Sequence, residues 1–391
     1  LLGIGVKFGH KDMQLPFLEG TSRLWPSYLL RDQPPLVKLL LHVQAELPEF
    51  WAVLFGDAGG WPEVLWLSIS MASAHCVLTL LYGIFLLILR PFRLRRPSVA
   101  ELSRDVRACW PDVYDAELQE LCSLTTCQLQ ALQIVREQCR ASHFKALPKL
   151  TGRAKDLGFS KEDVDSTLTW IRDKAPIIIH VDLAANGSLL AKDTHYRNQF
   201  ETGSSRGTLS RKKRSRWEDD LFCGAYAGAT GFECCKYGAM NVVNDLQGVR
   251  ACRQYGFSYL LLRNVRLRTT FSAGDSAGKT SGDLATIDYF AHVLSRFKDE
   301  ELKGVFKVGT QQVESVNSAV LSSYKEAQIH GEVRLLDHVE RIMAHSSLAK
   351  ASTAPIIAEL AAAPCAKVSW IPGGTKQLPG EPPWPWASTA D

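Results

Sequence analysis

The chain has 391 residues, 45 Lys and Arg against 41 Asp and Glu, and a net charge of +4. A hydrophobic content of 46% excludes a wholly disordered or collagen-like chain, and the small net charge does not favour nucleic acid as a partner. Ten Cys without any C-x-x-C pair match neither a dense disulfide framework nor a common zinc site. The composition therefore indicates a globular protein of one or two domains.

The N-terminal part contains one long uncharged segment. Residues 1–63 show no clear pattern, but Val64–Leu89 contains no Asp, Glu, Lys or Arg. At about 1.5 Å per helical residue it can cross the roughly 30 Å hydrocarbon core of a membrane. The alternatives are a long buried helix and a cleaved signal peptide. We expect a single transmembrane helix, which makes the membrane a partner of the chain.

The charges around this segment predict its orientation. Acidic residues precede it, whereas four arginines follow it directly: Arg90, Arg93, Arg95 and Arg96. Because positive charge is retained on the cytoplasmic side, we expect a single-pass membrane protein with residues 90–391 in the cytoplasm.

Helical patterns follow. Capping-box sequences begin at Ser98 and Thr125, and a further helix is expected over Lys161–Asp173. The first of these helices predict a helical linker over 90–145.

Strand and helix signals then alternate irregularly. The strand patterns are Ile177–Val181, Phe257–Arg263, Leu267–Phe271 and Glu326–His330, and the helix patterns are Leu284–Leu294 and Leu335–Met343. We expect an α+β fold, with a mixed domain built on a small sheet over 146–345. Residues 346–391 are rich in Ala and Pro and are predicted to be a disordered tail.

Five polar or Gly-containing stretches occur in this domain. They are Tyr196–Ser205 (YRNQFETGSS), Trp217–Tyr226 (WEDDLFCGAY), Lys236–Asn241 (KYGAMN), Arg268–Ser276 (RTTFSAGDS) and Tyr324–Gly331 (YKEAQIHG). In this order they resemble an uncharacterised, mainly bacterial family of unknown function. The last two are also similar to C-terminal domains of some phage head-morphogenesis proteins, which are suspected relatives of ADP-ribosyltransferases.

The last stretch carries the candidate catalytic residues. On a strand, Glu326, Gln328 and His330 share one face. A glutamate there could stabilise positive charge at C1′ as nicotinamide leaves NAD, Gln328 could hold an acceptor, and His330 could move a proton. In ADP-ribosyltransferases the corresponding motif ends in a Glu that follows another Glu or Gln by two residues, whereas here Glu326 precedes Gln328. The alternative is a polar strand face without chemistry.

Candidate cofactor-binding residues lie in the other stretches. The resemblance to ADP-ribosyltransferases implies Arg197 for the phosphates of NAD and Thr202 or Ser204 for the nicotinamide-ribose pocket. Asp275 could bind a ribose or cap a turn. Tyr237 and Asn241 could contact a base, or could be a core tyrosine and a turn asparagine.

These observations lead to two hypotheses. The first is a membrane-anchored, ADP-ribosyltransferase-like domain that transfers ADP-ribose from NAD to a protein substrate, and the second is a non-catalytic interaction module with the same fold. No metal is expected, because His180, Asp182 and His195 do not make a complete ligand set at defined spacing. The basic run Arg206–Arg216 is expected to be a solvated loop.

Overall fold

The computed structural model describes residues 98–203, 210–350, 352–363 and 367–372, together with two short antiparallel strands, β1 (Lys7–Phe8) and β2 (Lys11–Asp12). The chain divides into two compact units, residues 1–92 and 93–391. The helices and strands over residues 99–370 belong to the second unit.

The predicted transmembrane helix is corrected. No helix among the described residues is both long enough and apolar enough to cross a membrane. The segment Val64–Leu89 itself lies outside the described residues. A membrane-spanning helix is therefore not part of the fold as described, and the single-pass topology and cytoplasmic placement that depended on it are not carried further.

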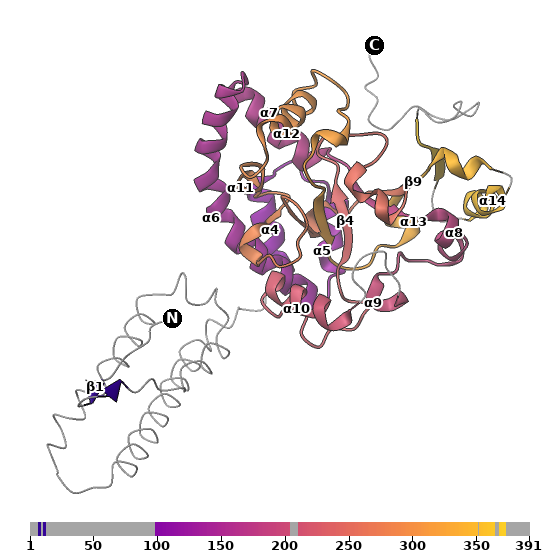
Figure 1. Ribbon diagram of the computed structural model, residues 1–391, viewed down its shortest axis with the longest axis horizontal. Coiled ribbons are helices and arrows are strands. Elements are labelled where there is room, and N and C mark those ends of the chain that lie inside the picture. The colour runs from indigo at the N-terminus through magenta and orange to yellow at the C-terminus, as the bar shows by residue number, and fades with distance from the viewer. Residues whose placement is uncertain are drawn as a thin grey trace, which may run out of the picture. The chain divides into compact units, whose positions relative to one another are not determined.

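An eight-stranded sheet forms the centre of the unit, which is of the mixed α+β class (Figure 1). Its order is β10-β9-β5-β3-β4-β8-β6-β7, and all neighbours are antiparallel except the parallel pair β9 and β10. The strands are β3 (Ile177–Val181), β4 (Lys236–Met240), β5 (Ser258–Leu262), β6 (Thr269–Ser272), β7 (Leu284–Thr286), β8 (Lys325–Ile329), β9 (Val339–Ala344) and β10 (Lys367–Trp370).

Helices surround this sheet, and α6 is the longest of those described (Figure 1). The N-terminal helices are α4 (Val99–Cys109), α5 (Asp115–Cys122), α6 (Thr126–Asp156) and α7 (Lys161–Asp173). Those between the strands are α8 (Leu183–Lys192), α9 (Gln199–Thr202), α10 (Arg211–Phe222), the 3-10 helix η3 (Arg250–Tyr255), α11 (Ala291–Leu294), α12 (Asp299–Gly309) and α13 (Leu335–His338). The last is α14 (Ala354–Ala362), which packs on α8.

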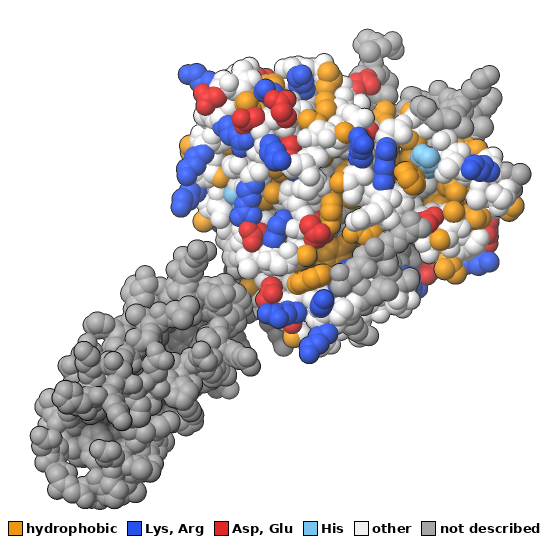
Figure 2. Space-filling model, viewed as in Figure 1, with side chains coloured by type: hydrophobic (Ala, Val, Ile, Leu, Met, Phe, Trp, Pro, Cys, Tyr) orange, Lys and Arg blue, Asp and Glu red, His pale blue; other side chains and the backbone are white. Residues whose placement is uncertain are grey.

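The two faces of the sheet differ in chemistry because strand side chains alternate. One face presents Ile177, Ile179, Phe271 and Ile329, which belong to the main apolar core together with side chains of α4 to α7, α11 and α12. The register places Tyr237, Glu326 and Gln328 on the opposite face, which also carries a smaller apolar cluster around Ile178 and Ala239. Figure 2 shows basic and acidic side chains interspersed on the visible surface. The polar sheet face positions the candidate site.

The N-terminal helices are not a linker. Leu102, Leu121 and Leu132 are buried in the same core cluster as Phe271 and Ile329 of the sheet. The capping box at Thr125 is confirmed, with the Thr125 backbone N–H donating to Gln128 Oε1 over 2.9 Å. These helices cover the apolar face of the sheet and are part of the domain.

Two helix predictions are wrong. The 3–4 spacing of apolar residues over Leu284–Leu294 comes from strand β7 followed by the one-turn helix α11, and Leu284, Ala285 and Ile287 are all buried. Likewise, the expected helix Leu335–Met343 is the single turn α13 followed by β9. Strand β7 is buried on both faces, and in Leu335–Met343 a helical turn is followed directly by a strand, so neither segment keeps the period that distinguishes helix from strand.

The tail prediction is corrected in part. Within residues 346–391, α14 and β10 are ordered elements, and Leu360 and Ile371 are buried. Strand β10 obtains its hydrogen-bond partners from β9, in the register Val368↔Ile342, so its stability comes from a segment distant in sequence.

Candidate functional site

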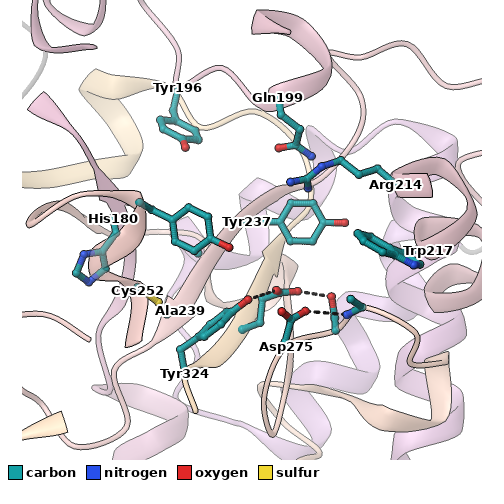
Figure 3. A pocket seen from close by; sticks show the side chains of 15 residues that line it. His180, Tyr196, Gln199, Arg214, Trp217, Tyr237, Ala239, Cys252, Asp275 and Tyr324 are labelled. Atoms are coloured by element: carbon teal, nitrogen blue, oxygen red, sulfur yellow. Dashed lines mark hydrogen bonds between the residues drawn. The ribbon is translucent and has the colours of Figure 1, made fainter. Parts of the chain in front are cut away.

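A pocket of about 280 Å³ opens on the polar face of the sheet, over β4 and β8 (Figure 3). Aromatic side chains line much of it, from Tyr196, Trp217, Tyr237, Tyr255 and Tyr324. The polar side chains lining it are His180, Gln199, Arg214, Asp275, Ser276 and Glu326. An aromatic wall with a few converging polar groups is the usual composition of a small-molecule site.

Glu326 is the buried carboxylate of this pocket, with an exposed fraction of 7%. Ser276 Oγ donates a hydrogen bond to its Oε1, Gln328 Nε2 donates to the same oxygen over 3.0 Å, and Tyr324 OH donates to Oε2 over 3.1 Å. Burial raises the pKa of Glu326, and the donors Ser276, Gln328 and Tyr324 oppose that rise. These donors also fix the orientation of the carboxylate.

A chain of hydrogen bonds continues from Gln328 beneath the pocket. Thr270 Oγ1 donates to Gln328 Oε1 over 3.0 Å and lies 3.2 Å from His330 Nε2, while Tyr226 OH lies 2.6 Å from His330 Nδ1. Since the Thr270 proton is directed to Gln328, Thr270 accepts from Nε2–H, and Tyr226 donates to Nδ1. Every donor in this chain therefore points toward Glu326.

His330 is accordingly a neutral structural histidine. It is fully buried, and burial together with the charge of Arg268 lowers its pKa to about 3. Neither His330 nor Gln328 lines the pocket. Both belong to the hydrogen-bond chain that leads to Glu326. The shared strand face expected from the sequence therefore exists, but only its first residue, Glu326, reaches the cavity.

Two nitrogen donors, from Gln199 and Arg214, also line the pocket. Figure 3 shows the amide of Gln199 and the guanidinium of Arg214 directed toward the same part of the cavity. The Gln199 Nε2 atom is buried and has no hydrogen-bond partner among the described residues. A buried amide donor without a partner is uncommon, so this atom marks a place where a ligand acceptor would be favourable.

Three of the residues expected from the sequence come together here: Tyr237, Asp275 and Glu326 line one pocket. Asp275 also behaves as a turn residue, because its Oδ1 accepts from the Ala277 N–H over 2.9 Å. Asn241 does not reach the pocket, since its side chain bonds the backbone of Asp245 in both directions over 2.9 Å.

Two residues that the resemblance implied for NAD, Arg197 and Thr202, do not line the pocket. The Arg197 guanidinium forms ion pairs with Asp193 at 2.9 Å and Glu201 at 3.1 Å, and it does not line the pocket. Thr202 Oγ1 donates to the Asn198 carbonyl over 3.1 Å. Ser204 lies outside the described residues.

The pocket residues that sequence reasoning missed are mostly neighbours of the predicted ones. Tyr196 and Gln199 belong to the same motif as Arg197 but face the cavity. Tyr324 immediately precedes β8, and Arg214 and Trp217 share a face of α10 at a spacing of three residues. That i,i+3 pair was the sequence signal for the part of the pocket that α10 forms.

The basic run Arg206–Arg216 is therefore not simply a solvated loop. Its described C-terminal part forms the beginning of α10, whose N-cap Ser210 accepts from the Lys213 N–H over 3.4 Å. This helix brings Arg214 to the pocket.

The three residues considered for a metal are separated and engaged. His180 Nε2 accepts from the Val249 N–H over 3.0 Å and its Nδ1 donates to the Gly256 carbonyl over 2.8 Å, so both ring nitrogens are occupied. Asp182 caps α8, and His195 pairs with Glu332. Across the described ranges, no group of three or more His, Cys, Asp or Glu side chains is placed to hold a metal.

No curated protein matches the chain. Residues 179–317 match the model of a family described as "Protein of unknown function (DUF3626)". The matched range contains four of the five motifs complete, all except Tyr324–Gly331, and runs from within β3 to the segment before β8. This part of the chain is thus similar to an uncharacterised family, as its motifs indicated.

Proposed function

We propose that the pocket binds the nicotinamide-riboside end of NAD and that the domain transfers ADP-ribose from NAD to an acceptor. The observation that carries this proposal is the position of Glu326, a buried carboxylate held by three donors inside an aromatic-lined pocket. The resemblance of the Tyr324–Gly331 motif to suspected relatives of ADP-ribosyltransferases supports the same reaction class.

The residues present fit part of such a ligand. Tyrosine and tryptophan rings can stack on a pyridine ring. The Glu326 carboxylate has about four acceptor sites, of which three are used, so it can accept from one ribose hydroxyl. The Gln199 amide, which has no hydrogen-bond partner among the described residues, and the Arg214 guanidinium are donors suited to phosphate oxygens. In this proposal Arg214 takes the role that the resemblance implied for Arg197.

The volume limits how much of the ligand is enclosed. At about 280 Å³, the pocket lies at the lower end of ligand sites, which span roughly 300–1,000 Å³. It suits one nucleoside-sized half of the dinucleotide, so the proposal is confined to the nicotinamide-riboside end.

The chemistry requires stabilisation of positive charge. NAD supplies a bond from C1′ to a pyridinium nitrogen whose electron pair leaves with neutral nicotinamide. A preorganised carboxylate beside C1′ stabilises the charge that develops there and needs no reorientation during the reaction. Ser276, Tyr324 and Gln328 provide that preorganisation for Glu326.

The test compares the full chain with Glu326→Gln. We expect the wild-type protein to bind NAD in calorimetry and to release nicotinamide, detected by chromatography. Removing the charge should lower kcat by about 100-fold or more. The control is Glu314→Gln, which changes an exposed glutamate outside the pocket. Equal activity of Glu326→Gln and wild type would reject the role of Glu326, and absence of NAD binding and turnover would reject the function.

The non-catalytic interaction module is kept as a second candidate. It is favoured by the near-complete enclosure of Glu326, because a carboxylate that already accepts three hydrogen bonds has little capacity left for a substrate. Under this reading NAD is not turned over, and Glu326→Gln retains whatever protein partner the wild type captures.

A further inference from the structure

A second buried carboxylate lies beside the pocket, next to the lining residue Tyr237. Glu218 follows Trp217 on α10 and has an exposed fraction of 2%. Its Oε1 accepts a hydrogen bond of 2.9 Å from the hydroxyl of Tyr237, whose ring lines the pocket. Figure 3 shows the Tyr237 hydroxyl directed toward the Trp217 side of the cavity. Tyr237 therefore connects the pocket to a carboxylate that does not line it.

The groups around Glu218 come from three segments. Tyr237 lies on β4, the thiols of Cys234 and Cys235 precede that strand, and Arg214 lies on α10. The Cys235 thiol donates weakly to Glu218 Oε1 over 3.7 Å, and Tyr226 is a further buried neighbour. Burial is the largest influence and raises the pKa of Glu218 to about 7, against the lowering effects of Tyr237, the two thiols and Arg214.

We propose that Tyr237 and Glu218 form a proton relay that receives the proton lost by the acceptor when it attacks C1′. This inference rests on the proposed transfer reaction and assigns its proton acceptor. Tyr237 touches the acceptor and is the catalytic residue, whereas Glu218 acts through it as a positioning residue.

The step balances. The acceptor O–H or N–H bond breaks, and its electron pair forms the new bond to C1′ as the pair of the old bond leaves with nicotinamide. The acceptor proton moves to the Tyr237 oxygen while the Tyr237 proton moves to Glu218 Oε1, 2.9 Å away. After product release, the reverse movement returns one proton to water in the pocket.

The proposal gives separate roles to two carboxylates. Glu326 is held by three donors and stabilises charge, whereas Glu218 gains a proton. A base with a pKa near the working pH combines availability with driving force, and distinct environments for two carboxyl groups are a usual way to divide such roles.

The first test is the pH dependence of nicotinamide release by the full chain. In the wild type, kcat should rise with pH through about 7, as Glu218 ionises. Glu218→Gln and Tyr237→Phe should each lower kcat by at least about 10-fold. They should also abolish the rise of kcat with pH and leave KM for NAD little changed. The control Cys235→Ala keeps the Tyr237–Glu218 bond and removes only a weak donor that lowers the pKa of Glu218, so the rise of kcat with pH should remain and move to slightly higher pH.

A second readout does not depend on turnover. Infrared difference spectra of the protein without NAD should show a carboxyl band that appears as the pH falls through about 7. The band should be absent in Glu218→Gln and shifted in Tyr237→Phe, which loses the hydrogen bond. If the wild type turns over NAD and Glu218→Gln keeps the same rise of kcat with pH, the relay is overturned and the proposed function is not. Failure of the wild type to turn over NAD at any pH overturns the proposed function, and the relay with it.

Discussion

Glu218 affects stability in the direction opposite to most carboxylates. A surface Asp or Glu in an ion pair has a lowered pKa and stabilises the fold at neutral pH. The pKa of Glu218 is instead raised by burial from 4.5 to about 7. The folded state therefore binds more protons at this site than the unfolded state between these two values, and stability falls as the pH rises through this window.

This gives a prediction for Glu218→Gln. The substitution keeps an acceptor for Tyr237 and removes the charge that is buried at high pH. Relative to wild type, the variant should gain up to about 3 kcal/mol in free energy of unfolding between pH 4.5 and pH 8. Urea unfolding at a series of pH values measures the difference. A constant difference between the two proteins across this range would contradict the raised pKa.

The sequence predicted single residues well only where one local rule decides their direction. Strand alternation placed Glu326 and Gln328 on one face, as the register shows. No such rule applied to Tyr196–Ser205, where a bridge between His195 and Arg334 and the single turn α9 set which side chains face the cavity. Arg197 was expected at the phosphates from the resemblance to ADP-ribosyltransferases, yet nearby Asp193 and Glu201 bind it outside the pocket.

At the scale of elements, single strands with a strong apolar pattern could be predicted, but the strands that pair with them could not. Ile177–Val181 is confirmed as β3, because five consecutive buried residues of a strand give an unbroken apolar run. The paired strand β4 was missed, since Gly238 and Lys236 weaken its pattern. Gly238 is needed there, because a Cβ atom would lie 2.5 Å from the Ile178 carbonyl oxygen. Such close approach between strands is a tertiary fact that the local sequence does not contain.

The C-terminal elements provide a prediction at this scale. Leu360 and Ile371 are buried, and Ile371 packs in the cluster that includes Ala239 and Cys252 at the pocket. Their burial contributes roughly 3–6 kcal/mol together, less the entropy of ordering the segment. A chain ending at His345 should therefore have a lower Tm than one ending at Pro372, which keeps α14 and β10. Calorimetry that finds equal Tm values would show that these elements add no stability.

At the scale of the whole molecule, buried histidines and buried glutamates oppose each other in their response to acid. Burial lowers the pKa of His180 to about 4 and that of His330 to about 3. The unfolded chain binds protons at these sites below its ordinary value of about 6.5, whereas the fold does not. Stability from these neutral rings is present above that value and is lost as the pH falls toward the folded values.

The magnitudes indicate which effect is larger. Between pH 6.5 and pH 5 the two histidines together remove about 4 kcal/mol of stability, while protonation of Glu218 restores about 2 kcal/mol. We therefore expect the wild type to lose stability over this interval and Glu218→Gln to lose it more steeply, because the opposing group is gone. Urea unfolding of both proteins measures the slopes, and nitrogen-15 spectra of the imidazoles should show His180 and His330 still neutral in the folded protein at pH 5. Titration of either ring near pH 6.5 in the folded state, or equal slopes in the two proteins, would contradict this account of the buried polar face.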